Sequence, residues 1–135
     1  MRHLTRALLG LIPAVLAAGC AAVGYYDPPY ALVESGFGSP VRKELPVLIK
    51  AVDGQSTMYA RASGPIKPGR HVVDVYLGTR VGPYSKQLRQ LAIDADACTR
   101  YRIVAGYQNL THIEWTPVIY REPIGECLAD LRGKG

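Results

Sequence analysis

The chain has 135 residues, with 16 Lys and Arg against 11 Asp and Glu and a formal net charge of +5. This length suits one domain with a modest hydrophobic core. The basic residues are scattered rather than clustered in a run, so the composition disfavours a nucleic-acid binder.

The first 19 residues have the three parts of a secretory signal peptide. Arg2 and Arg6 make a basic start, residues 7–19 are apolar, and the run ends in small residues. The apolar run is shorter than the roughly 20 residues that a membrane-spanning helix needs. The pattern therefore predicts a signal peptide over residues 1–19.

The end of this segment, Ala17-Ala18-Gly19-Cys20, resembles the lipobox of bacterial lipoproteins, with Ala17 where that family prefers Leu. The resemblance implies that Cys20 is acylated and becomes the mature N-terminus, held in a membrane by two or three acyl chains. Ala21, in place of Asp, implies the periplasmic face of the outer membrane. The alternative is ordinary cleavage at an A-x-A-like site, with Cys20 as a chance neighbour.

Removal of residues 1–19 takes away two arginines, so the net charge falls from +5 to +3. A secreted chain with this mild charge is not expected to meet DNA or RNA. The partners that the sequence predicts are the membrane, through the acyl chains, and an envelope protein or peptidoglycan.

The three cysteines are an odd number, which would leave one thiol unpaired in an oxidising compartment. With Cys20 acylated, Cys98 and Cys127 form one candidate disulfide pair. Their loop of about 30 residues would contribute roughly 3.5 kcal/mol in the loop-entropy model. The alternative is a pair of reduced, buried cysteines.

Residues 20–45 are rich in Gly, Pro and Tyr and show no sustained periodicity. They predict an extended tether, with a short strand near residues 31–34 as an option. Tyr25, Tyr26 and Tyr30 offer a possible interaction surface; equally, the segment can pack back onto the domain.

From residue 46 onward the sequence consists of short strand candidates separated by turns. Turns are predicted at Asp53-Gly54 and Pro68-Gly69, a bulge or edge at Pro117, and a helical turn at the end over residues 125–133. The strand candidates are residues 47–55, 57–63, 71–79, 85–95, 98–108 and 112–122. This spacing predicts an all-β fold, a small antiparallel β-sandwich of about six to seven strands over residues 46–135.

The clearest strand is the one near residues 98–108, which alternates. Tyr101, Ile103, Ala105 and Tyr107 share one face. Trp115, the largest apolar group, is expected in the core.

Val52-Asp53-Gly54, the Pro68-Gly69 turn with His71, and the strand from Tyr101 to Ala105 resemble PEGA-type domains over residues 46–108. These are small transthyretin-like β-sandwiches of bacterial envelope proteins. The chain departs from that pattern in its cysteine pair and in lacking a second Gly after the first hairpin. The resemblance implies a non-catalytic accessory module with no functional residues to transfer.

Residues that carry catalysis or bind metals are sparse. No G-x-S-x-G, H-E-x-x-H, P-loop or C-x-x-C motif occurs, and Gly36-Phe37-Gly38 lacks the third glycine and the helix of a dinucleotide loop. His112 and Glu114 share a strand face but lack a third metal ligand, and Asp94 with Asp96 is only part of a calcium loop. His71 is interpreted as a packing residue beside a turn. The sequence thus predicts no cofactor and no enzyme activity.

The predicted function is that of a lipid-anchored structural or protein-interaction module of the envelope. A lipoprotein that binds cell-wall glycan through its tyrosines is the alternative, and a periplasmic hydrolase is the third hypothesis.

Overall fold

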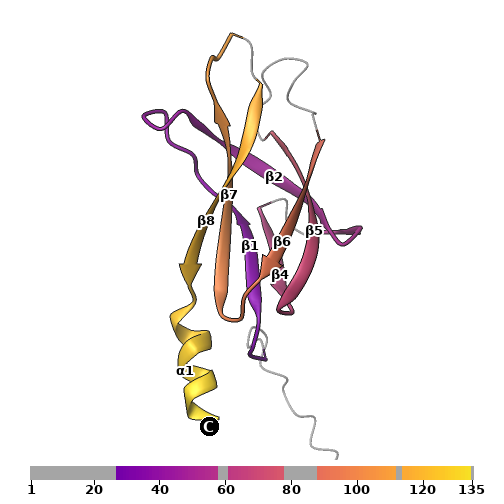
Figure 1. Cartoon of the computed structure of the whole chain (residues 1–135), viewed down its shortest axis with the longest axis vertical. Helices are drawn as coiled ribbons and strands as arrows, with labels where there is room; N and C mark the ends of the chain where they lie inside the picture. Colours follow the sequence, from indigo (N-terminus) through magenta and orange to yellow (C-terminus); the bar gives the residue numbers. More distant parts are fainter. Residues whose placement is uncertain (1–26, 58–60, 78–87, 112–113, 135) are drawn as a thin grey trace, which may run out of the picture.

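The computed structural model describes residues 27–57, 61–77, 88–111 and 114–134, and Figure 1 shows their arrangement. The elements are β1 (Ala31–Ser35), β2 (Glu44–Val52), β3 (Gln55–Ser56), β4 (Ala62–Ile66), β5 (Gly69–Leu77), β6 (Leu88–Ala95), β7 (Thr99–Tyr107), β8 (Trp115–Pro123) and α1 (Gly125–Gly133). The predicted all-β class is confirmed. Within these ranges no helix has the length and apolar character to span a bilayer.

The strands form one mixed sheet that turns over on itself so that its two halves pack face to face. One half has the order β4-β1-β7-β8, and the other has the order β3-β2-β5-β6. Strand β2 belongs to both, because Glu44–Pro46 pairs with β7 while Val47–Val52 pairs with β5. Pro46 lies where β2 changes partner, a position at which its missing N–H disturbs neither ladder.

The sheet differs from a wholly antiparallel one at β1, which runs parallel to β7. All the other strand pairs are antiparallel. The strand suggested near residues 31–34 is therefore present as β1, and the sheet begins at Ala31 rather than at residue 46. A parallel pair joins strands far apart in the chain, so no local pattern announces it.

The main core lies between the two halves of the sheet. The predicted inward face of β7 is confirmed, since Tyr101, Ile103, Ala105 and Tyr107 are all buried. Trp115 is also buried there, opposite Tyr107 in the ladder. Valines and isoleucines fill the rest, and burying each such side chain stabilises the fold by about 1.5–3 kcal/mol.

The turns explain two of the strand boundaries. Asp53 and Gly54 both have positive φ, which fits the predicted tight hairpin between β2 and β3. Of the strand predicted over residues 57–63, residues 58–60 lie outside the described residues; the described strand β4 is Ala62–Ile66 and includes Gly64 and Pro65. Proline is tolerated in this strand because β4 is an edge strand that pairs only with β1.

A second, smaller core closes the end of the molecule where β1 begins and α1 follows β8 (Figure 1). It contains Tyr30, Cys98, Ile124 and Cys127, with Leu32 and Leu131 packed against them. Cys98 N–H donates to the Tyr30 carbonyl over 2.7 Å, and Ile124 N–H donates to the Cys98 carbonyl over 2.8 Å. The predicted Cys98–Cys127 disulfide is present and ties α1 to the start of β7.

Replacing both cysteines, as Cys98→Ser with Cys127→Ser, should lower the free energy of unfolding by about 3.5 kcal/mol, because the unfolded chain regains the entropy of an open loop. Urea denaturation of the oxidised chain and of the double variant measures this. An unchanged urea midpoint would show that the bridge carries no stability.

Candidate functional site

Of the residues predicted to contact the membrane or a partner, Cys20, Tyr25 and Tyr26 lie outside the described residues. His112, a weak candidate for metal binding, also lies outside them. Tyr30 is only 6% exposed and belongs to the smaller core. Its expected place in an interaction surface is therefore corrected, because it is buried among Cys98, Ile124 and Cys127.

His71 makes two close polar contacts on the rim of β5. Its Nδ1 lies 2.6 Å from Asp53 Oδ2, and its Nε2 lies 2.7 Å from the Lys67 carbonyl oxygen. Asp53 Oδ1 also accepts the Val72 N–H over 2.8 Å. His71 thus ties the β2–β3 turn to the β4–β5 turn.

The two partners of His71 favour its protonated form. A carboxylate and a carbonyl are both acceptors, and the ring donates to both only when both nitrogens carry a proton. Partial burial lowers the pKa of His71, but the hydrogen bonds to Asp53 and Lys67 outweigh it and leave that pKa raised. Both nitrogens are engaged, so His71 acts as a structural clamp between the two turns.

The clamp predicts a pH dependence of stability. Because the folded-state pKa of His71 lies above its ordinary value of about 6.5, its stabilising contribution is complete below that pH. The contribution is lost as the pH rises through the folded-state pKa. Unfolding free energies measured from weakly acidic to weakly alkaline pH should therefore fall in the wild type, and His71→Gln should remove this fall. A His71 pKa at or below 6.5 by NMR would contradict it.

A groove of about 460 Å³ crosses the outward face of β7 and β8, under the loop of residues 36–43. We call it the outer groove. Its lining residues are Gly36, Phe37, Gly38, Arg42, Arg102, Val104, Tyr120, Arg121 and Glu122. Two aromatic residues and the arginines Arg42 and Arg102 therefore border one concavity. The guanidinium of Arg121 lies over the Tyr101 ring instead.

Two glycines hold the loop against the sheet. Gly36 N–H donates to the Ile103 carbonyl over 2.8 Å, and a Cβ at Gly36 would lie 2.4 Å from Val104 Cγ1. Gly38 has a φ of +73°, and a Cβ there would lie 2.6 Å from the Glu44 carbonyl oxygen. Phe37, between them, is 79% exposed and stands over the groove.

A matched pair of substitutions separates backbone strain from steric conflict. Gly38 and Gly54 have similar positive φ, but a Cβ at Gly54 would have no neighbour within 4 Å. Gly54→Ala should cost about 1–2 kcal/mol of stability from backbone strain alone. Gly38→Ala should cost about 1–3 kcal/mol more, because the Glu44 backbone must move. Equal losses by chemical denaturation would refute the close packing of the loop.

Glu44 is only 5% exposed, and its carboxylate bonds to two residues that line the outer groove. Arg42 Nε donates to Glu44 Oε2 over 3.0 Å, and the Tyr120 hydroxyl donates to Glu44 Oε1. The bond from Tyr120, followed by that from Arg42, outweighs burial and lowers the pKa of Glu44. The same bond to Glu44 raises the pKa of Tyr120. Arg42 also lies over the Tyr120 ring, so the loop, β2 and β8 are joined at one point.

The other charges on this face are also paired. Arg102 Nε lies 3.1 Å from Glu122 Oε2 across the β7–β8 ladder, and Arg100 Nε lies 3.2 Å from Glu34 Oε1. Arg121 is opposite Tyr101 in the ladder, lies over that ring and pairs with Asp96. Exposed guanidinium and aromatic faces of this kind suit binding.

The predicted weak metal motifs receive structural roles. Asp94 contributes its backbone carbonyl to the Tyr101 hydroxyl over 3.1 Å, and the Asp96 side chain pairs with Arg121. In the described ranges no three His, Cys, Asp or Glu side chains gather as metal ligands would.

No sequence pattern predicts the outer groove. The one available signal is the single Phe of the chain, which stands between two glycines. Arg42, Arg102 and Tyr120 come from three segments and gather only in the folded sheet.

Comparison of the chain with protein-family models, with curated proteins and with solved structures finds no match.

Proposed function

We propose that this protein is a lipid-anchored β-sandwich of the bacterial envelope that binds another envelope protein and performs no catalysis. The cysteines carry the proposal. Cys98 and Cys127 are bonded to each other, which leaves Cys20, at the end of the lipobox-like segment, as the remaining cysteine. A structural disulfide fits an oxidising compartment outside the cytoplasm, where an acylated Cys20 is no longer a reactive thiol.

The outer groove supports the binding role. Its arginines are held in ion pairs and its rings are exposed at the rim, so a partner meets a preformed surface. Preformed surfaces bind with less loss of conformational entropy than flexible ones do. Arg and Tyr are also among the residues enriched at protein interfaces.

Cell-wall glycan is the second candidate partner. Phe37 and Tyr120 offer apolar ring faces beside the hydrogen-bond donors of Arg42 and Arg102, a combination that also suits sugar rings bearing carboxylates. With Ala21 after the anchor, the predicted location is the periplasmic face of the outer membrane, within reach of both partners.

Photo-cross-linking in cells tests the proposal. A photoreactive amino acid replaces Tyr120 in the groove or, as a matched control, Tyr76 on the outer face of β5 in the other half of the sheet. We expect one defined envelope protein to be captured from position 120 and not from position 76. Cys20→Ala should abolish both capture and the acylated N-terminal peptide seen by mass spectrometry.

The other outcomes are informative in different ways. An unmodified Cys20 in the wild type would remove the anchor and leave the groove to be judged by the cross-links alone. Equal capture from positions 120 and 76 would refute the groove as the binding surface. Absence of a protein cross-link together with co-sedimentation on isolated peptidoglycan, beyond that of an unrelated β-sandwich, would favour the glycan.

A further inference from the structure

The most exposed of the large apolar side chains lie at one end of the molecule. Among the described residues the three most exposed are Val41 at 95%, Phe37 at 79% and Leu110 at 59%, whereas the other exposed large apolar residues reach only 38–43%. All three lie on the loops of residues 36–43 and 108–111. These loops are at the end of the sandwich away from α1 and from the start of β1 (Figure 1).

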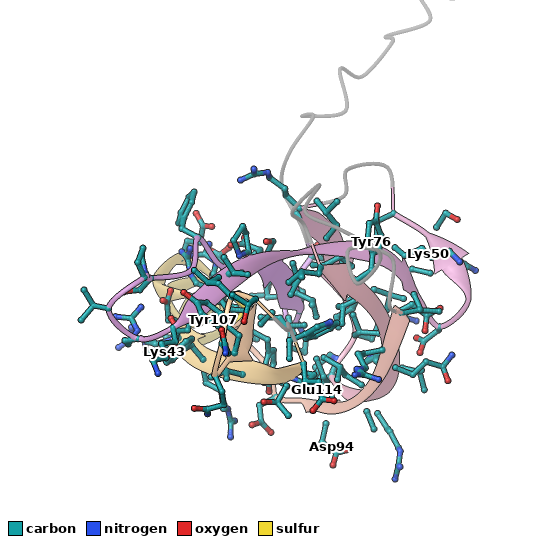
Figure 2. The ribbon with its side chains drawn as sticks, turned by 90° about the horizontal axis from the view of Figure 1, so that it is seen from above. Lys43, Lys50, Tyr76, Asp94, Tyr107 and Glu114 are labelled. Atoms are coloured by element: carbon teal, nitrogen blue, oxygen red, sulfur yellow. A yellow bond between two sulfur atoms is a disulfide. The ribbon has the colours of Figure 1, made fainter. Side chains whose placement is uncertain are left out.

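The two loops form one surface, which we call the distal tip. Tyr107 N–H donates to the Lys43 carbonyl over 2.9 Å, and Lys43 Nζ lies 3.4 Å from the Gln108 carbonyl oxygen. Figure 2 looks down on this end and shows Lys43 and Tyr107 next to each other. The distal tip comprises Phe37, Val41 and Leu110 with Arg42 and Lys43.

The exposure of these side chains is built into the backbone. Arg42 N–H and Glu44 N–H both donate to the Ser39 carbonyl, over 3.1 and 2.9 Å, and Lys43 N–H donates to the Pro40 carbonyl over 3.1 Å. With Gly36 and Gly38 fixed against the sheet, the loop has no means of turning Val41 inward without breaking these bonds. A group of exposed apolar side chains held in this way is typical of a protein or membrane interaction site.

The charge of the distal tip indicates which environment its apolar side chains suit. Residues 36–43 and 108–111 contain Arg42 and Lys43 and no Asp or Glu. Arg42 is paired with the buried Glu44, so Lys43 supplies the net positive charge of the tip. Val41 and Leu110 are exposed and do not line the outer groove. Protruding Phe, Val and Leu beside Arg and Lys suit the interface of an anionic bilayer, where apolar groups enter the acyl boundary and cations meet phosphates.

We propose that the distal tip inserts into the surface of an anionic lipid bilayer. This inference rests on the proposed anchor only for proximity. Residues 20–30 can span at most about 40 Å when extended, comparable to the roughly 30 Å of a nine-residue strand. An anchored domain lying on its side therefore brings the distal tip to the same membrane.

The test measures local depth in the bilayer. The full-length acylated chain carries Val41→Cys or, as a matched control, Val72→Cys on β5, each labelled with an NBD fluorophore. It is reconstituted in vesicles of phosphatidylglycerol and phosphatidylcholine, with or without brominated acyl chains. We expect blue-shifted emission and quenching by bromine at position 41 and water-exposed emission at position 72.

Two further variants identify the forces. Phe37→Ser in the Val41→Cys chain should lower the ratio of inserted to free tip about tenfold, from the apolar area lost. Leu128→Ser on α1, a residue 38% exposed, should leave it unchanged. Lys43→Asn removes a charge while keeping a residue that tolerates the positive φ at this position. It should weaken insertion only where phosphatidylglycerol is present.

Other results overturn the inference. Water-exposed emission at position 41 on vesicles refutes insertion. A shift at position 41 that grows with protein concentration in the absence of lipid assigns the surface to a second copy, and one that requires an added envelope protein assigns it to that protein. Because the label reports on its own depth, these outcomes do not depend on the acylation of Cys20, which the mass of the N-terminal peptide decides separately.

Discussion

Strand β7 hydrogen-bonds with three other strands, and the rest of the molecule is arranged around that sharing. Along one edge it pairs with β8 from Thr99 to Tyr107. Along the other, β1 takes the part up to Ile103 and β2 takes Val104–Gly106. Each position on this edge of β7 can pair with only one strand, so the pairing with β1 must end before Val104, where the pairing with β2 starts. The chain between them has to leave the sheet at Ile103 and return at Gly106, which creates the loop of residues 36–43.

That loop gives the protein its distinctive surface. It bends back over β7, so the glycines on either side of Phe37 are needed for close approach and for positive φ. Its return places Glu44 under Tyr120, where Arg42 and the tyrosine hydroxyl compensate for the loss of water around the carboxylate. The outer groove and the distal tip therefore both depend on the loop of residues 36–43.

The two ends of the sandwich are built differently. At one end, the disulfide, α1 and Tyr30 close a small apolar core next to the point where the N-terminal segment enters. At the other, apolar side chains point outward and cations flank them. The most exposed apolar side chains of the described residues therefore lie at the end opposite the one where the described chain begins.

By itself the sequence determined what depends on neighbouring residues. Alternation and turn residues predicted most of the strands and the inward face of β7, and Asp53-Gly54 predicted a hairpin. The odd number of cysteines, with Cys20 assigned to the lipobox-like segment, predicted the Cys98–Cys127 pair. These follow from period, turn geometry and counting, which are local properties of a chain. Only the tertiary structure decided that β1 runs parallel to β7, that Tyr30 is buried, and that Arg42, Arg102 and Tyr120 meet in one groove. Each of these depends on contacts between segments far apart in the sequence, and such contacts are selected by the packing of the whole sheet.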